Sequence, residues 1–277
     1  MMIEFMKMSG AGNDFIVLDN RNGRYDDLEE IHIRRLCERK RGIGADGLIM
    51  LQSDNDVDFS MRYFNRDGRE AEMCANGARC VVLFAHFIFP NRWDFSFNSP
   101  SGLHTGSLVN ADGKQLVEIA MPSPTHILPE DRIRIGKRDI AFGFIVVGVP
   151  HVVIFYKEMP ETTEILELGR NVRNHERFGI QGTNVNFVTV KGRDNIEIRT
   201  YERGVEEETL ACGTGSTAAS ILSTLRGLTH PPVRCLTRGG DILTVTFEYD
   251  TATGDISNLK LLGEAQLVYE GRLDFRP

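Results

Sequence analysis

Two cysteines lie in matching sequence contexts, and their thiol groups can act as an acid and a base. Cys74 and Cys212 each precede a turn of small residues, and an apolar run with helical spacing follows (78–89 and 216–225). We expect each cysteine at a helix N-terminus, where unpaired backbone N–H groups and the helix dipole favour negative charge. Such a position lowers a thiol pKa and also suits a carboxylate or phosphate. Two such sites predict two thiols acting on one anionic ligand.

Two thiols on opposite faces of an α-carbon would invert its configuration. One thiolate removes the α-proton, and the other thiol returns a proton to the opposite face. Because that proton is weakly acidic, N–H groups at the helix ends would hold the α-carboxylate and stabilise developing charge. The scheme needs no Schiff-base cofactor. The sequence contains no C-x-x-C pair and no nucleotide-binding glycine fingerprint, so we expect no cofactor and no metal.

The composition is ordinary for a soluble globular protein. Five cysteines are too sparse for a disulfide framework, and Cys37, Cys80 and Cys235 are expected to be buried thiols. The net charge of -7 gives no reason to expect nucleic acid as a partner. No apolar run reaches the length of a membrane span, and the N-terminal segment lacks the pattern of a signal peptide. A cytoplasmic location and no membrane partner are therefore expected.

The two halves of the chain repeat one pattern of strands followed by a cysteine helix. Segments 13–18, 60–65 and 73–77 resemble, in the same order, segments 186–190, 197–202 and 211–215. The repeat predicts an α/β (α+β) protein of two pseudo-symmetric domains. Each would wrap a mostly antiparallel sheet around one central helix, with both helix N-termini at a shared cleft. Chance similarity between strand-rich halves is the weaker explanation, because each repeat carries a cysteine at the same turn.

The chain resembles the diaminopimelate epimerase family of cofactor-independent amino-acid racemases over nearly its whole length. The motifs together are specific, although most would be weak alone. They are Lys7–Phe15, Gly42–Leu48, Phe64–Gly68, Met73–Arg79, Pro150-His151, Asn184–Val188, Tyr201–Gly204 and Ala211–Gly215.

This resemblance implies a fold, an activity and a set of site residues. The implied domains are 1–118 with 266–277, and 119–265. The implied reaction interconverts LL- and meso-diaminopimelate by two-base catalysis at Cys74 and Cys212, within lysine and cell-wall precursor synthesis. The reacting amino-acid end would be held by Asn13, Ala75, Asn76, Gly213 and Thr214. The distal end would be held by Asn65, Asn184 and Arg203. Glu202 and His151 would lie near the thiols and orient or tune them, with Glu202 also contacting substrate.

The chain departs from the family pattern at three places. Ala75 replaces a glycine but keeps the N–H that would bind a carboxylate. Val149 replaces an asparagine that helps to bind the distal end, and an unpaired buried polar group costs about 1–3 kcal/mol. The segment between Arg203 and Cys212 is one residue longer than in the usual form, which predicts a bulge in the loop.

Three functional hypotheses follow. The first is diaminopimelate epimerase, and the second is a related racemase or epimerase of another amino acid, motivated by Val149. The third is a thiol redox protein that cycles a disulfide between Cys74 and Cys212. It is the weakest, because exchange proteins keep their cysteines close in sequence. Taken singly, the asparagines would be turn or cap residues, Glu202–Arg203 a surface ion pair, and His151 a strand-end histidine. A homodimer is expected by resemblance alone.

Overall fold

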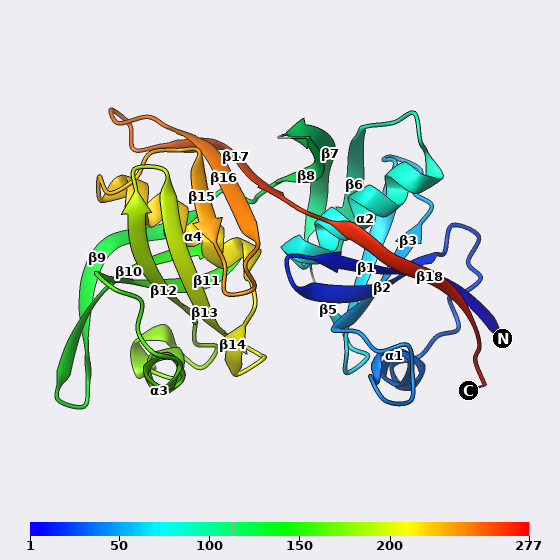
Figure 1. Cartoon of the computed structure of the whole chain (residues 1–277), viewed down its shortest axis with the longest axis horizontal. Helices are drawn as coiled ribbons and strands as arrows, with labels where there is room; N and C mark the ends of the chain where they lie inside the picture. Colours follow the sequence, from blue (N-terminus) through cyan, green and yellow to red (C-terminus); the bar gives the residue numbers. More distant parts are fainter. Residues whose placement is uncertain (72, 112, 277) are drawn as a thin grey trace. The chain divides into compact units, whose positions relative to one another are not determined.

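Each half of the chain folds a mostly antiparallel sheet against one apolar helix. The computed structural model describes residues 1–71, 73–111 and 113–276, and it divides the chain into two units. Unit 1 comprises Met1–Ile119 and Gly263–Pro277, and unit 2 comprises Ala120–Leu262. Pro277, the last residue of the expected N-terminal domain, lies outside the described residues. Figure 1 shows one such helix, α2 or α4, within each unit.

Unit 1 contains nine strands and two helices among its described residues. They are β1 (Met2–Gly10), β2 (Asn13–Asp19), α1 (Glu30–Cys37), β3 (Gly47–Gln52), β4 (Phe59–Asn65), β5 (Glu70–Ala71), α2 (Ala75–Ile88), β6 (Asp94–Ser99), β7 (Gly102–Ala111), β8 (Lys114–Ala120) and β18 (Gln266–Asp274). The strand pairings run β18-β1-β2-β3-β4-β6-β7-β8, and the short β5 pairs with the end of β4. The β2–β3 and β4–β6 pairs are parallel.

Unit 2 repeats this arrangement. Its elements are β9 (Thr125–Ile135), β10 (Arg138–Val147), β11 (Val149–Tyr156), α3 (Thr162–Arg173), the 3₁₀ turn Glu176–Phe178, β12 (Asn184–Gly192), β13 (Asn195–Glu202), β14 (Glu207–Thr209), α4 (Gly213–Leu225), β15 (Val233–Leu236), β16 (Ile242–Tyr249) and β17 (Ile256–Gly263). Their pairings run β9-β10-β11-β12-β13-β15-β16-β17, with β14 at the end of β13. The parallel pairs are β11–β12 and β13–β15. The expected class and the pair of similar domains are confirmed.

The matching pairings define which positions correspond between the units. Phe15 pairs with Gly47 across β2 and β3, and His151 pairs with Asn184 across the equivalent strands β11 and β12. The strand that begins at Asn13, β2, therefore corresponds to β11. The sequence comparison matched it to the segment at Asn186, which lies in the neighbouring strand β12, so that match is wrong. Both segments place an asparagine before β-branched and aromatic residues, and local composition alone does not distinguish them.

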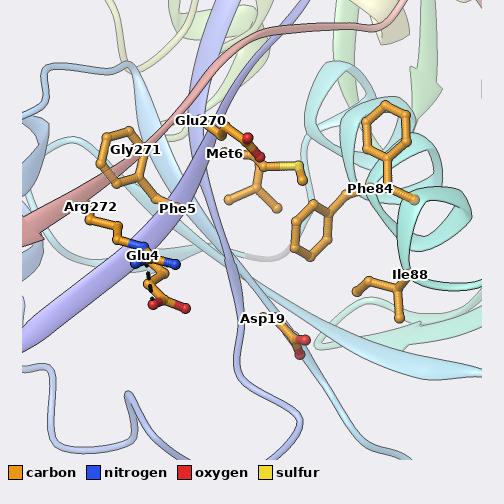
Figure 2. A pocket seen from close by; sticks show the side chains of 11 residues that line it. Glu4, Phe5, Met6, Asp19, Phe84, Ile88, Glu270, Gly271 and Arg272 are labelled. Carbon is orange, nitrogen blue, oxygen red and sulfur yellow. Dashed lines mark ion pairs between the residues drawn. The ribbon is translucent and has the colours of Figure 1, made fainter.

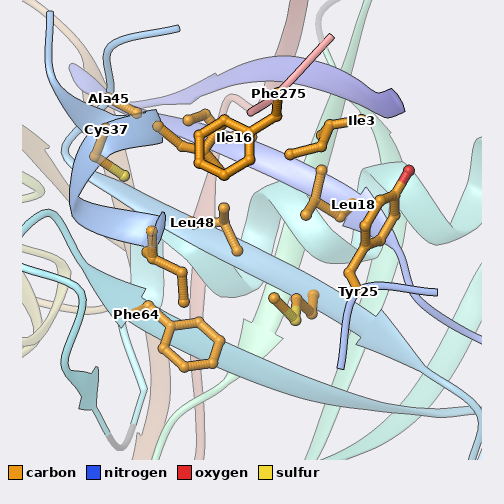
Figure 3. Close-up of a cluster of buried hydrophobic side chains, with 12 residues drawn as sticks. Ile3, Ile16, Leu18, Tyr25, Cys37, Ala45, Leu48, Phe64 and Phe275 are labelled. Carbon is orange, nitrogen blue, oxygen red and sulfur yellow. The ribbon is translucent and has the colours of Figure 1, made fainter. Parts of the chain in front are cut away.

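A second helix covers the outer face of each sheet. In unit 1, residues of α1 pack with Ile16, Leu18 and Leu48 into a buried cluster. Phe275, near the C-terminus, belongs to the same cluster (Figure 3). In unit 2 the corresponding cluster joins α3 to Val152, Phe187 and other residues of the sheet. With residues buried on both of its faces, each sheet is a rigid frame for the helix at its centre.

The central helices are apolar over most of their length. Every residue from Ala75 to Ala85 in α2 is buried, and so is every residue from Gly215 to Ser223 in α4. Their apolar sequences bury all faces, which is typical of helices enclosed by a sheet. None of the helices within the described part of the chain is both long and apolar enough to cross a membrane.

The loop that leads into α4 is anchored by a buried ion pair. Arg199 on β13 donates two hydrogen bonds to Glu208 on β14, at 2.5 and 2.7 Å, and the Glu208 side chain is only 1% exposed. Arg238 donates to the same carboxylate at 2.5 Å. In the preceding turn Glu206 has a positive φ of 61°, in the segment where the sequence predicts one extra residue. The anchored β14 then leads directly to Cys212.

Candidate active site

Both candidate thiols are N-cap residues of the central helices, as the sequence predicts. Cys74 precedes α2 with φ −116° and ψ 122°, and Cys212 precedes α4 with φ −130° and ψ 113°. Both are partly exposed, whereas Cys37, Cys80 and Cys235 are buried. Burial raises the pKa of each of those three thiols to about 12. The two N-cap cysteines are thus the ones placed to react.

The first turn of α4 surrounds the sulfur of Cys212. The backbone N–H of Gly215 donates to Sγ at 3.4 Å, and the hydroxyl of Thr214 lies 3.4 Å from the same sulfur. Donors of this kind stabilise a thiolate more than a thiol, and the helix dipole acts in the same direction. The N–H groups of Gly213 and Thr214 precede the first helical hydrogen bond, so they have no acceptor within the helix.

In unit 1 a hydrogen-bonded chain of side chains lies beside Cys74. Asn76 donates from Nδ2 to Oδ1 of Asn13 at 2.6 Å, and Arg79 donates to Oδ1 of Asn76 at 2.7 Å. Asn13 in turn donates to Asp46 at 3.1 Å. Each of these amides uses one of its two N–H donors within the chain, so Asn13 and Asn76 each have one N–H left to offer a ligand. They are therefore suited to bind an acceptor such as a carboxylate.

A cluster of charges fixes the far end of that chain. Asp14 forms ion pairs with Lys7 and Arg39, each at 2.7 Å, and Arg39 also pairs with Asp46 at 2.7 Å. Burial acts to raise the pKa of Asp14, but hydrogen bonds from Arg39 and Lys7 outweigh it and hold that pKa well below its usual range. Asp46 is thereby kept in place to orient Asn13.

In unit 2 the candidate distal residues lie against the start of β11. Asn184 donates from Nδ2 to the carbonyl of Pro150 at 3.2 Å and accepts from the backbone N–H of Arg203 at 2.8 Å. Asn184 is only 4% exposed. The side-chain carbonyl of Asn184 therefore fixes the backbone of Arg203, from which the Arg203 side chain extends.

His151 is fully buried in a polar cluster of unit 2. Its Nδ1 lies 3.3 Å from Nδ2 of Asn186, which also donates to the Val152 carbonyl at 2.9 Å. The Thr200 hydroxyl donates to Oδ1 of Asn186 at 2.9 Å. Burial, with a smaller contribution from Arg203, lowers the pKa of His151 to about 3. This histidine is neutral at physiological pH.

The remaining expected residues lie at the ends of strands. Asn65, at the end of β4, is exposed and accepts from the Tyr63 hydroxyl at 2.9 Å. Glu202 occupies the corresponding end of β13 and accepts from the Thr209 hydroxyl at 2.8 Å. Val149 occupies the β11 position that corresponds to Asn13 on β2. The matched positions therefore carry side chains of different polarity, with Asn13 in unit 1 corresponding to Val149 in unit 2 and Asn65 corresponding to Glu202.

The structure places the expected residues in two groups, one in each unit. Unit 1 brings Asn13, Ala75 and Asn76 to Cys74, with Asn65 at a neighbouring strand end. Unit 2 brings Gly213 and Thr214 to Cys212, with His151, Asn184, Glu202 and Arg203 at the ends of β11, β12 and β13.

A cavity of about 570 Å³ in unit 1 contains none of these residues. It is lined by residues such as Phe84, Ile88 and Arg272 (Figure 2). Glu4 and Arg272, neighbours on the paired strands β1 and β18, form an ion pair at 3.4 Å in its lining. Phe84 and Phe87 lie towards the C-terminal end of α2, whereas Cys74 caps its N-terminus.

The sequence does not point to three supporting residues, Asp46, Arg79 and Asn186. Asp46 stands in a glycine-rich turn, where aspartate is common for local reasons. Arg79 is completely buried within α2, and Asn186 is buried in β12. The sequence offered one signal for each of the latter two residues: Arg79 is a charged residue in an apolar helix, and Asn186 is a polar residue in an apolar strand.

The family model and the similar sequences name one family. The family model described as Diaminopimelate epimerase matches residues 5–127 and 143–267. The diaminopimelate epimerase of Aquifex aeolicus (strain VF5) is 40% identical, covering 98% of this chain and 98% of the relative. That of Chlorobaculum tepidum is 38% identical, covering 96% of this chain and 99% of the relative.

Solved structures share the fold at much lower identity. A probable proline racemase from Agrobacterium radiobacter K84 matches with a TM-score of 0.73 at 14% identity, covering 99% of this chain and 94% of that one. A phenazine biosynthesis protein of the PhzF family from Bacillus anthracis matches with a TM-score of 0.71 at 13% identity, covering 99% and 100%. With a family model over most of its length and relatives of this identity, the chain belongs to the diaminopimelate epimerase family.

Proposed function

We propose that this protein is an isomerase that interconverts LL- and meso-2,6-diaminopimelate, a step in lysine and peptidoglycan precursor synthesis. The observation that carries the proposal is the pair of partly exposed cysteines, Cys74 and Cys212, each an N-cap of a buried central helix. Membership of the family and the names of its relatives support the substrate.

In the proposed reaction the two cysteines act as acid and base on one α-carbon. The thiolate of one removes the α-proton, and the thiol of the other donates a proton to the opposite face. The N–H groups at the start of α2 and α4 hold the α-carboxylate and stabilise the carbanionic transition state. The residues proposed for this role are Ala75, Asn76, Gly213 and Thr214, with Asn13 beside Asn76. Electrostatic help of this kind replaces a cofactor in the scheme.

The distal end of the substrate is proposed to meet Asn65, Asn184, Glu202 and Arg203. The Arg203 guanidinium is suited to a bidentate contact with the distal carboxylate. Asn184 uses its carbonyl on the Arg203 backbone and one N–H on Pro150, so one N–H remains for the substrate. Its main contribution would then be to position Arg203.

A second candidate function is epimerisation or racemisation of a different amino acid. The observation that favours it is Val149, which has no side-chain hydrogen bonds to offer where the family commonly has asparagine. Loss of such a contact costs about 1–3 kcal/mol in binding if the substrate group is left unpaired. Weaker binding of diaminopimelate, with a raised KM, is the expected signature of this change.

The test is proton NMR of LL-diaminopimelate with the reduced protein in deuterated water. We expect deuterium at one α-carbon and appearance of the meso isomer without any added cofactor. Absence of exchange at both α-carbons would reject this substrate. The same assay across other α-amino acids would then test the second candidate. Val149→Asn should lower the KM for diaminopimelate under the first proposal.

Assembly and location complete the proposal. All five cysteines are free thiols, which suits the reducing cytoplasm. We also propose a homodimer, supported by exposed Leu267, Val268 and Tyr269 on β18, an edge strand that pairs with β1 in the described part of the chain. Light scattering coupled to size-exclusion chromatography tests this directly, and a mass near the 31.1 kDa of one chain would reject the dimer.

A further inference from the structure

Unit 2 contains a buried polar cluster that the fold itself does not require. His151, Asn186 and Thr200 are all buried, with exposed fractions of 0%, 0% and 3%. The matching strand pairings place Phe15, Ile49 and Tyr63 at the corresponding positions of unit 1. The same architecture therefore accepts larger apolar or aromatic residues there. Burying polar groups in their place lowers stability unless they are fully paired, which points to a functional reason.

The orientation of the Asn186 side chain follows from its neighbours. One end of the amide lies 2.9 Å from the backbone carbonyl of Val152, which can only accept. That end must be the NH₂ group, because an amide oxygen would face another oxygen. The other end accepts from the Thr200 hydroxyl at 2.9 Å. The amide has therefore one allowed orientation.

This orientation determines where His151 carries its proton. The second N–H of Asn186 points to Nδ1 of His151 at 3.3 Å, so Nδ1 must accept and cannot be protonated. A neutral imidazole then carries its proton on Nε2. Among the described residues Nε2 has no hydrogen-bond partner, although it is fully buried. An N–H donor is thus held in place and unused by the protein.

The cluster touches the helix turn that carries the candidate thiol. A methyl group on Gly215 would collide with Oδ1 of Asn186 and would lie 3.3 Å from Sγ of Cys212. Asn186 therefore packs directly under the turn whose N–H contacts that sulfur. The charged group that acts on this cluster is Arg203, whose positive charge disfavours protonation of His151.

We propose that Asn186 is a positioning residue that holds His151 as the neutral imidazole protonated on Nε2. His151 then serves the Cys212 end of unit 2 as a hydrogen-bond donor to an anionic atom and does not accept the thiol proton. The proposal rests on the proposed function only in taking Cys212 as a reacting thiol.

The test is nitrogen-15 NMR of the histidine side chains in the protein without substrate. The His151 signals are assigned by their loss in His151→Gln. We expect Nδ1 in the unprotonated region and Nε2 in the protonated region, with neither shift changing between about pH 5 and pH 8, since an ordinary histidine titrates near 6.5. A protonated Nδ1, or titration of His151 within that range, would overturn the proposal.

Two variants test the part played by Asn186. Asn186→Asp places a carboxylate oxygen against Nδ1, so we expect Nδ1 to gain a proton and the pKa of His151 to rise to about 6.5 or above. Asn186→Leu removes the donor and should give a mixture of the two neutral forms. Retention of the wild-type tautomer in both variants would show that Asn186 does not position His151.

Matched controls separate this role from a general structural effect. Asn174→Asp makes the same chemical change at an exposed position and should leave the His151 signals unchanged. Thr200→Val removes the hydroxyl that contacts Oδ1 but keeps both N–H donors of Asn186, so the tautomer should persist. Because these spectra need no substrate, failure of this inference is distinguishable from failure of the proposed epimerase activity.

Discussion

At the scale of single residues, the difference among the five cysteines carries most of the functional argument. Three thiols are buried with pKa values raised to about 12, and they remain protonated at neutral pH. Cys74 and Cys212 instead occupy partly exposed N-caps. Reactivity is therefore assigned by position on a helix and not by residue type.

Replacing either N-cap cysteine should abolish most of the epimerase activity. We expect Cys74→Ser and Cys212→Ser each to lower kcat by roughly 10²–10⁴, the usual contribution of a positioned acid or base. Serine keeps the shape but is far less acidic than a thiol. Initial rates by NMR measure the effect, and Cys37→Ala should retain wild-type kcat. An unchanged kcat in either serine variant would contradict two-base catalysis.

His151 should make stability depend on pH in the mildly acidic range. Its folded pKa of about 3 lies below the value near 6.5 of an unfolded chain, so only the unfolded state gains a proton between these values. The contribution is fully present above about pH 6.5 and is lost as pH falls towards 3. At pH 5 the loss is about 2 kcal/mol.

Urea unfolding at pH 7 and pH 5 measures this dependence. In His151→Gln the difference between the two pH values should shrink by about that amount. A smaller dependence in the same direction should remain, because burial also lowers the pKa of His104. The pH dependence would be assigned to other groups if the variant kept the full wild-type difference.

At the scale of elements, the third residue of each central helix has a different neighbour. A methyl group on Gly77 would lie 3.1 Å from the flexible end of Ile49 and 3.5 Å from Met61. At Gly215 the neighbour is the Asn186 amide, which three hydrogen bonds fix in place. The same substitution therefore has different consequences in α2 and α4.

We expect Gly215→Ala to reduce the free energy of unfolding by about 1–3 kcal/mol, as overpacking against an immobile group does. Gly77→Ala should have a smaller effect, because Ile49 can move and alanine is favoured over glycine in helices by about 1 kcal/mol. Urea unfolding of the two variants gives the comparison. Equal losses would show that the polar cluster is not rigid.

Two strands that the sequence pattern does not predict show the limit of pattern-based prediction. The edge strands β9 and β18 alternate little between buried and exposed residues, and β18 buries none of its nine residues. Because their buried and exposed residues do not alternate regularly, they lack the period-2 signal on which strand prediction depends. The central helices and the N-cap cysteines were predictable, because small residues before a long apolar run are a local signal.

Contacts between distant segments could not be predicted in the same way. The link from Asn13 to Asp46 joins two segments separated by an entire helix, and only the parallel pairing of β2 and β3 brings them together. Likewise the pairing of β11 with β12 brings Asn186 to His151. Parallel neighbours leave no trace in local sequence, so supporting residues of the site are found only once the register is known.

At the scale of the whole molecule, the proposed mechanism requires both candidate thiols to be reduced. We expect mild oxidation to join Cys74 to Cys212 and to abolish activity, because both thiols must be free for proton transfer. Peptide mapping by mass spectrometry identifies the bond, and dithiothreitol should restore the rate. Activity that survives in a sample shown to contain the bond would contradict the mechanism.

The position of β18 has a consequence for how the protein is made. Unit 2 is one continuous segment, whereas unit 1 needs the last strand of the chain to pair with its first, and the amino group of Met1 donates to the Phe275 carbonyl at 2.6 Å. During synthesis the middle of the chain can finish folding while the beginning still waits for its final strand. Unit 1, whose synthesis begins first, is therefore completed only when β18 has been made.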